Sequence, residues 1–199
     1  LPDWLFGRFD LMSFQILPAI LNPTLSELIA AGAAMVVIVG AIVTVALLTW
    51  FRGWRPLWRD WLTSTDHKRI GIMYVVLAIV MMARGVIEGA VMRTQQAFGL
   101  GGGFLTPEHF SELFTTHGTI MIFFVAMPLI AGIVNYVLPL MLGARDMSFP
   151  VMNQISFGLT TTGAALVMIS LVFGQFSNGS WAAYPPYTGM DFQPGPGPD

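Results

Sequence analysis

The chain alternates between long apolar runs and shorter polar stretches. Four runs reach the length of about 20 residues that a helix needs to cross the hydrocarbon core of a membrane. They cover residues 28–50, 70–91, about 113–144 and about 151–176. The stretches between and after them contain charged residues, proline or glycine, which typically end helices. The pattern therefore predicts an all-α protein, a polytopic membrane bundle with four transmembrane helices in this chain.

Two of the runs are irregular. The third contains Pro128 and Pro139, and proline removes a backbone donor and crowds the preceding turn, so we expect the helix to bend there. The second is interrupted by Arg84 and Glu88, which are unexpected in a membrane span.

Basic residues give the orientation. The stretch 52–69 holds five of the nine Lys and Arg residues, whereas 95–112 holds none. By the positive-inside rule, 52–69 is a cytoplasmic loop, which places the amino terminus and the loop with His109 outside. Four tryptophans beside the basic loop are typical of an aromatic belt at the inner interface. They are Trp50, Trp54, Trp58 and Trp61.

These signals divide the chain into five segments. We expect an outer amino-terminal segment, a first helix, a basic cytoplasmic loop, three further helices, and an outer loop rich in proline and glycine. Their ranges are 1–27, 28–51, 52–69, 70–178 and 179–199.

Composition supports the membrane class. Hydrophobic residues make up 55% of the 199 residues and charged residues 10%, far below the roughly one quarter usual in soluble domains. A net charge of −2 gives no nucleic-acid surface, so no nucleic-acid partner is expected. Cysteine is absent, which excludes disulfides and thiolate metal sites and leaves histidine and carboxylates as the strong metal ligands.

His117 is the first candidate for chemistry. It lies in an almost charge-free stretch, where an ionisable side chain is costly and usually functional. A neutral imidazole offers a lone pair to a metal, and an apolar helical surface suits a haem, so His117 is a candidate axial haem ligand. The alternative is a structural histidine hydrogen-bonded by Thr115 or Thr116.

Arg84 and Glu88 are the second candidate. Arg84 lies about 21 Å along a helix that starts inside, so it falls in the same outer half of the membrane as His117. Residues four apart share a helix face, so Arg84 and Glu88 can pair. The pair is either a structural ion pair between helices or a polar pocket for a small amphiphile with a polar head group. Asp146, beside Arg145, is by itself a solvated loop charge.

Four strings carry a family resemblance. They are WLTSTDHKRIGIMY, MMARGVIEGAVMRTQQ, FTTHGTIMIFFVAMPLIAGIVNYVLPLMLGARDMSFPVMNQISF and GSWAAYPPYTG. Together they resemble subunit I of the haem-copper terminal oxidases, and in particular the cytochrome bo-type ubiquinol oxidases of bacteria. The resemblance runs from about residue 28 to the last residue.

The resemblance implies roles for several residues. His117 would be an axial ligand of the low-spin haem, expected to be of B type, with Arg93 and Trp181 at the haem periphery. Asp146 would be the entrance of a proton pathway on the inner side. Asn135 and Asn153 would hold water in the channel above it.

The resemblance also implies a quinol pocket. The bo-type family has an extra amino-terminal helix, as this chain does, and builds the pocket from an arginine, an aspartate, a histidine and a glutamine. Arg84 and His109 match two of these, while Glu88 stands in place of the aspartate and Glu112 in place of the glutamine. Ubiquinol is therefore the expected electron donor, with cytochrome c as the alternative.

The implied function is that of the amino-terminal part of the catalytic subunit of a proton-pumping oxidase, which oxidises ubiquinol and reduces dioxygen to water. The implied cofactors are the low-spin haem and, in the complete subunit, a high-spin haem and copper, whose family ligands lie in later helices. Expected partners are the remainder of subunit I, oxidase subunits of types II, III and IV, and lipids. The expected location is the bacterial inner membrane, with the amino terminus periplasmic.

Two other interpretations remain open at this point. One is a haem-bearing, quinone-linked membrane subunit without oxygen chemistry. The other is a non-redox transporter or assembly subunit in which Arg84, Glu88 and His117 form an ion relay.

Overall fold

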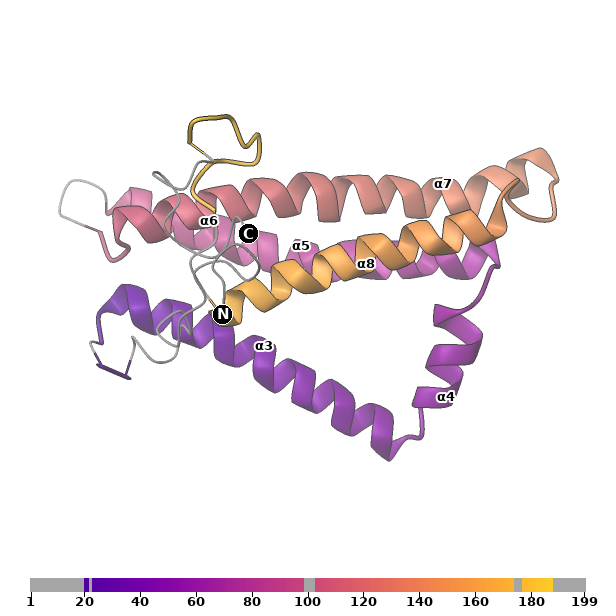
Figure 1. Cartoon of the computed structure of the whole chain (residues 1–199), viewed down its shortest axis with the longest axis horizontal. Coiled ribbons are helices and arrows are strands. Elements are labelled where there is room, and N and C mark those ends of the chain that lie inside the picture. Colours follow the sequence, from indigo (N-terminus) through magenta and orange to yellow (C-terminus); the bar gives the residue numbers. More distant parts are fainter. Residues whose placement is uncertain (1–19, 22, 99–102, 174–176, 188–199) are drawn as a thin grey trace, which may run out of the picture. The chain divides into compact units, whose positions relative to one another are not determined.

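The computed structural model describes residues 20–21, 23–98, 103–173 and 177–187. All regular structure in these ranges is helical, which confirms the predicted fold class (Figure 1). The elements in chain order are α3 (Leu25–Trp50), α4 (Trp54–Pro56), the π-helical η2 (Leu57–Leu62), α5 (His67–Ala97), α6 (Pro107–Thr119), the π-helical η4 (Ile120–Ala126), α7 (Met127–Leu142) and α8 (Pro150–Phe173). The predicted segments 1–27 and 179–199 lie partly outside the described residues, as do residues 174–176 of the fourth run.

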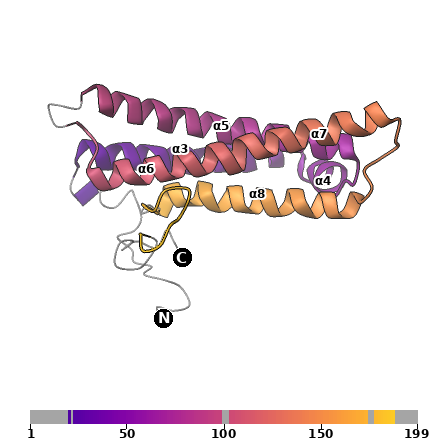
Figure 2. The same cartoon turned by 90° about the horizontal axis from the view of Figure 1, so that it is seen from above.

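Four helical stretches within the described ranges are long and apolar enough to cross a membrane, as predicted. They are Leu25–Trp50, His67–Ala97, Pro107–Leu142 and Pro150–Phe173. The third is built from three elements, and Figure 2 shows α6, η4 and α7 following one another as one continuous ribbon.

Capping side chains explain why three helices begin earlier than the apolar runs predict. The Thr24 Oγ1 accepts the Glu27 backbone N–H at 3.2 Å, and an Asp66 carboxylate oxygen accepts the Lys68 N–H at 2.9 Å. The Thr106 Oγ1 accepts the His109 N–H at 3.3 Å. Each side chain satisfies an amide that the first turn of a helix leaves unpaired.

The prediction of a loop over 95–112 is therefore wrong for much of its length. α5 continues to Ala97, and α6 begins at Pro107 with Glu108 in its first turn. Proline at the first helical position and an acid near the positive end of the helix dipole both favour this start. His109 is consequently a helical residue and not a loop residue.

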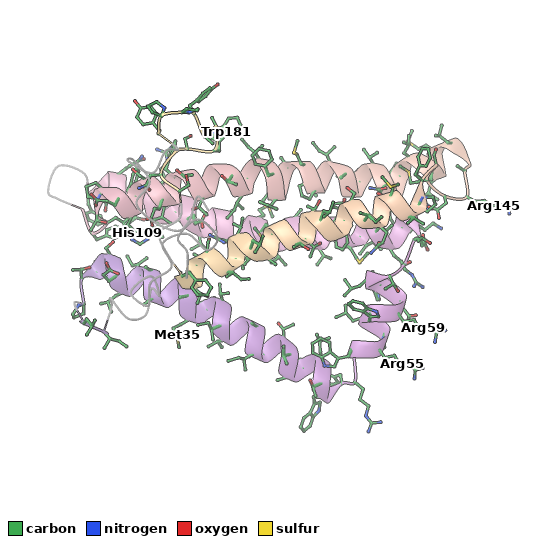
Figure 3. The ribbon with its side chains drawn as sticks, in the orientation of Figure 1. Met35, Arg55, Arg59, His109, Arg145 and Trp181 are labelled. Carbon is green, nitrogen blue, oxygen red and sulfur yellow. The ribbon has the colours of Figure 1, made fainter. Side chains whose placement is uncertain are left out.

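The basic stretch 52–69 is also more regular than predicted. It contains the helical segment Trp54–Leu62, which closes with a hydrogen bond from the Thr63 N–H to the Trp58 carbonyl at 3.1 Å. Trp58 is exposed, and the side chains of Arg55 and Arg59 extend away from the segment (Figure 3). Exposed tryptophan and arginine side chains suit a position among lipid head groups.

The prolines of the third helical stretch fit without ending it. The π-helical segment η4 immediately precedes the turn that contains Pro128, and Pro139 lies inside α7. The helix ends at Leu142, two residues before the predicted end, because Gly143 takes a left-handed conformation with φ 65°. The Gly143 and Ala144 amides then bond the carbonyls of Leu140 and Pro139, a common helix end.

The described chain forms two compact units. Unit 1 consists of the described residues within 1–40, 85–119 and 167–199, and unit 2 of residues 41–84 and 120–166. In unit 2, Tyr74 packs edge-on against Phe157 with ring centroids 5.0 Å apart, and its hydroxyl donates to the Ser156 Oγ at 3.1 Å. Ile70 and Met73 complete this buried cluster.

Two glycines let α5 and α7 approach closely in unit 2. A Cβ placed on Gly71 would lie 2.8 Å from the Gly132 carbonyl oxygen, and a Cβ on Gly132 would lie 2.8 Å from the Gly71 carbonyl oxygen. Backbone atoms cannot move aside as a flexible side chain can. The contact therefore requires glycine at both positions, as helix contacts in membranes often do.

Gly132→Ala should destabilise the protein by about 1–3 kcal/mol, because the added methyl group forces the two backbones apart. The matched control is Gly158→Ala in α8, where an added Cβ meets nothing within 4 Å. Thermal unfolding of the protein in detergent should give a lower midpoint for Gly132→Ala only. Equal midpoints for the two variants would contradict the close packing.

Candidate functional site

His117 is held by the backbone of a neighbouring helix in unit 1. It lies near the end of α6, is half-buried, and its Nδ1 is 2.9 Å from the carbonyl oxygen of Gly85 in α5. A carbonyl oxygen only accepts, so Nδ1 must carry the hydrogen and donate it. The neutral ring then has its lone pair on Nε2, the form in which histidine binds a metal while its other nitrogen is held.

Glycine also makes room for this ring. A Cβ on Gly89 would lie 3.2 Å from the His117 Cε1, so the absence of a side chain lets the imidazole lie against α5. The alternative was a hydrogen bond between His117 and the hydroxyl of Thr115 or Thr116, but in the structure both hydroxyls have other partners. The Thr116 hydroxyl donates to the Glu112 carbonyl at 2.8 Å, and the Thr115 Oγ1 accepts the Ser180 N–H at 3.1 Å.

The donor set near His117 fits a haem better than a bare metal ion. Within the described ranges, no group of three or more His, Cys, Asp or Glu side chains could hold a metal ion. A haem needs only one or two axial ligands from the protein, because its four ring nitrogens supply the others. A single histidine with a free Nε2 on an apolar helix is suited to that role.

The predicted periphery residues come from two different segments of unit 1. Trp181, in the segment after α8 (Figure 3), packs against Gly118, where an added Cβ would lie 3.1 Å from the indole Cδ1. Arg93 is exposed and donates to the Gln96 Oε1 at 3.1 Å. Gly85, Gly89 and Arg93 are spaced four apart in α5, so Arg93 shares the helix face that contacts His117.

Arg84 and Glu88 each lie one position before a glycine, Gly85 or Gly89, on the face of α5 that contacts His117. Both are buried, with exposed fractions of 8% and 5%, and their spacing puts them on one face of α5. Charges at this depth require polar partners, so the pair marks a polar site inside an apolar segment.

His109 and Glu112 lie earlier in α6, about two turns and about one turn before His117. Both are half-buried. His109 bonds to α3, with its Nδ1 2.8 Å from the Ser26 Oγ. The carboxylate of Glu112 is close enough to those of Glu27 and Glu108 to interact with them electrostatically.

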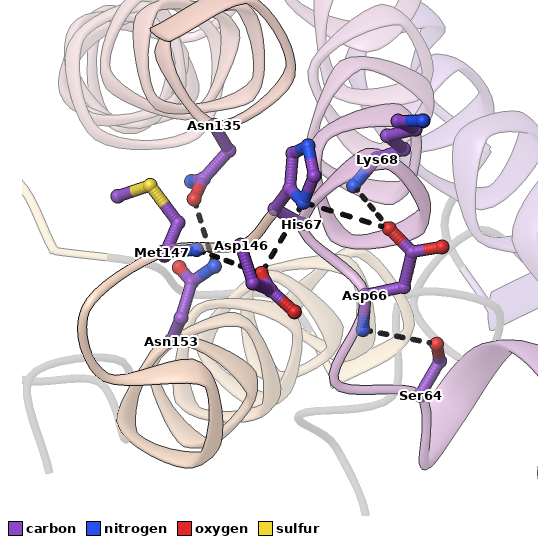
Figure 4. A network of polar contacts seen from close by, with 8 residues as sticks. All are labelled: Ser64, Asp66, His67, Lys68, Asn135, Asp146, Met147 and Asn153. Atoms are coloured by element: carbon purple, nitrogen blue, oxygen red, sulfur yellow. Dashed lines mark hydrogen bonds and ion pairs between the residues drawn. The ribbon is translucent and has the colours of Figure 1, made fainter. Parts of the chain in front are cut away.

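The candidates predicted for the inner side lie in unit 2 (Figure 4). Asn135, which is buried, donates to the Ala131 carbonyl at 2.9 Å and accepts from the Asn153 Nδ2 at 2.7 Å. Asp146 is half-buried and has one carboxylate oxygen 3.2 Å from the His67 Nδ1; the same oxygen accepts the Met147 N–H at 2.8 Å. Among the described residues, neither asparagine is hydrogen-bonded to Asp146.

The sequence interpretation missed two of these contacts. His67 was assigned to the basic loop, but its side chain is only 3% exposed and faces Asp146. Ser26 falls in the predicted amino-terminal segment, 1–27, but its side chain meets a residue 83 positions away. Neither position carries a local sequence signal that predicts its contact.

The fold and these polar residues define a class of helical membrane protein with ionisable side chains buried among its apolar helices. Residues 69–195 match the family described as Cytochrome C and Quinol oxidase polypeptide I, and the chain belongs to this family.

Several curated relatives are similar over most of the chain. It is 50% identical to the probable cytochrome c oxidase subunit 1 of Bradyrhizobium diazoefficiens over 169 residues, which cover 81% of this chain and 25% of that protein. It is 49% identical to the cytochrome bo(3) ubiquinol oxidase subunit 1 of Buchnera aphidicola over 154 residues, 76% of this chain and 23% of that protein. It is 45% identical to the quinol oxidase subunit 1 of Bacillus subtilis over 166 residues, which cover 83% of this chain and 25% of that protein. The chain thus spans about a quarter of the length of these relatives.

Proposed function

We propose that this chain is the part of a quinol oxidase subunit I that presents one axial ligand to a low-spin haem, of B type, and binds the electron donor beside it. The observation that carries the proposal is the 2.9 Å contact between the His117 Nδ1 and the Gly85 carbonyl, because it leaves Nε2 free for iron. A bound haem would supply one-electron redox chemistry. Arg93 and Trp181 would orient it.

Ubiquinol is the proposed donor. Its oxidation to ubiquinone releases two electrons and two protons, so the site needs proton acceptors and groups that hold the ring oxygens. Glu88 and Glu112 would accept protons, and Arg84 and His109 would hold the head group. Two of the relatives described above are named quinol oxidases.

Cytochrome c is the second candidate donor, because the relative from Bradyrhizobium diazoefficiens is named as a probable cytochrome c oxidase subunit. The buried Arg84 and Glu88 favour a small polar head group within the membrane over a protein donor at its surface.

Asp146 would collect protons from the inner side. Its half-exposed carboxylate can exchange protons with solvent. The amide groups of Asn135 and Asn153 would then hold water molecules along the next part of the pathway. In the complete subunit, with its high-spin haem and copper, these protons would be consumed as dioxygen becomes water.

This function implies a bacterial inner-membrane location with the amino terminus in the periplasm, so that quinol protons leave on the outer side. It also implies binding to the remainder of subunit I, to the other oxidase subunits of types II, III and IV, and to lipids.

His117→Ala in the complete oxidase should abolish the low-spin haem band in the reduced-minus-oxidised spectrum, together with ubiquinol-driven oxygen uptake, because the iron loses a ligand. Thr162→Ala, which removes an exposed hydroxyl bonded only to the Gly158 carbonyl, is the control and should retain both. A wild-type spectrum from His117→Ala would exclude His117 as the ligand.

Asp146→Asn should lower oxygen turnover by about a hundredfold, a typical loss when a positioned proton-transfer group is removed. The amide keeps the size of the side chain but cannot bind and release a proton at neutral pH. Arg145→Gln changes the neighbouring exposed charge and should keep wild-type turnover. Equal turnover in Asp146→Asn and wild type would contradict a role in proton uptake.

A further inference from the structure

Ser26 joins the amino-terminal helix to the proposed quinol site. It is the second residue of α3, is 3% exposed, and its Oγ lies 2.8 Å from the Nδ1 of His109 in α6. Both residues belong to unit 1. α3 precedes residue 69, where the match to the family begins, so this contact comes from a helix outside the matched part.

The hydrogen bonds around Ser26 define the direction of this contact. The Ser26 oxygen accepts the Thr106 backbone N–H at 3.5 Å. Within the described residues this buried hydroxyl has no other acceptor for its own hydrogen, and a buried hydroxyl hydrogen left unpaired is costly, so we assign the hydrogen to Nδ1 of His109. Nδ1 is then an acceptor, and the hydrogen of the neutral ring lies on Nε2. His109 is thus the opposite tautomer from His117, whose Nδ1 carries the hydrogen and donates it to a carbonyl.

The backbone of His109 is fixed as well, because its N–H bonds to the Thr106 hydroxyl at 3.3 Å. Thr106 therefore holds both Ser26 and the first turn of α6. A ring fixed at its backbone and at Nδ1 presents one remaining group, the Nε2–H, and that group can only donate.

We propose that Ser26 is a positioning residue for quinol oxidation, which holds the His109 ring so that its Nε2–H donates a hydrogen bond to a ring oxygen of the quinol. This rests on the proposed function of His109 in the quinol site. It gives the amino-terminal helix a direct part in binding the donor, and it leaves the carboxylates of Glu88 and Glu112 as the proton acceptors.

The test uses the complete oxidase containing this chain, with ubiquinol-1 as donor and oxygen uptake as readout. The variants are Ser26→Ala, His109→Ala, the double variant, and Ser170→Ala as matched control. Ser170 is a serine of the same unit whose hydroxyl donates only to the Val167 carbonyl of its own helix. Oxygen uptake with a one-electron dye donor that bypasses the quinol site, and the haem spectrum, report assembly.

Ser26→Ala should raise the KM for ubiquinol-1 about fivefold, the effect of losing one hydrogen bond, with a smaller change in kcat. Ser170→Ala should match wild type, and dye-driven uptake should be the same in all variants. In the His109→Ala background, Ser26→Ala should have no further effect, because its action passes through the imidazole.

The contrary outcomes are distinct. If His109→Ala raises KM but Ser26→Ala does not, or if the two effects add in the double variant, Ser26 does not position His109 while the quinol site stands. If His109→Ala oxidises ubiquinol-1 like wild type, the quinol site itself is wrong. Should Ser26→Ala fail to assemble, Ser26→Cys keeps the side-chain volume with a weaker donor, and an unchanged KM in that variant overturns the proposal.

Discussion

The hydrogen bond between the His117 ring and the Gly85 carbonyl is the interaction on which the site depends. An imidazole in an apolar helix is costly unless its polar atoms have partners. A backbone carbonyl already used in a helix has a second lone pair, so Gly85 can accept from Nδ1 without breaking α5. The glycine at 89 leaves the ring room to reach it. One contact therefore stabilises the pairing of the two helices, sets the tautomer, and leaves Nε2 for a ligand.

The same rule governs two other polar residues, which also meet a partner on another helix. His109 meets Ser26, and Asn135 meets Asn153. What differs is the direction of donation. A carbonyl partner makes Nδ1 of His117 a donor, whereas the buried Ser26 hydroxyl, which already accepts the Thr106 N–H, is assigned as the donor to Nδ1 of His109. Two histidines eight positions apart on one helix thus offer opposite chemistry, a lone pair at one and a hydrogen at the other.

The four membrane-spanning lengths could be predicted because burial in lipid demands about 20 apolar residues whatever the tertiary contacts. Helix ends could not, because they depend on single side chains such as Thr24, Asp66 and Thr106, whose hydrogen bonds begin helices outside the apolar runs. The π-helical turns before Thr63 and Pro128 have no such signal in the hydrophobic pattern.

The residues of the candidate site also divide into those that the sequence indicates and those that only the structure reveals. His117, Arg84 and Glu88 stand out in the sequence because their surroundings are apolar, and Asp146, Asn135 and Asn153 came from the family resemblance. Ser26, His67, Gly85 and Gly89 act through contacts between distant parts of the chain. Nothing local distinguishes them from ordinary serines, loop histidines or membrane glycines, so only a three-dimensional structure reveals them.

The most direct measurement is an electron cryo-microscopy structure of the complete oxidase that contains this chain, at a resolution that shows the ligands of the low-spin haem. The account predicts iron bonded to the Nε2 of His117, with Nδ1 of the same ring within hydrogen-bonding distance of the Gly85 carbonyl. A low-spin haem ligated by other residues, or a His117 ring that bonds the Gly85 carbonyl through Nε2, would contradict it.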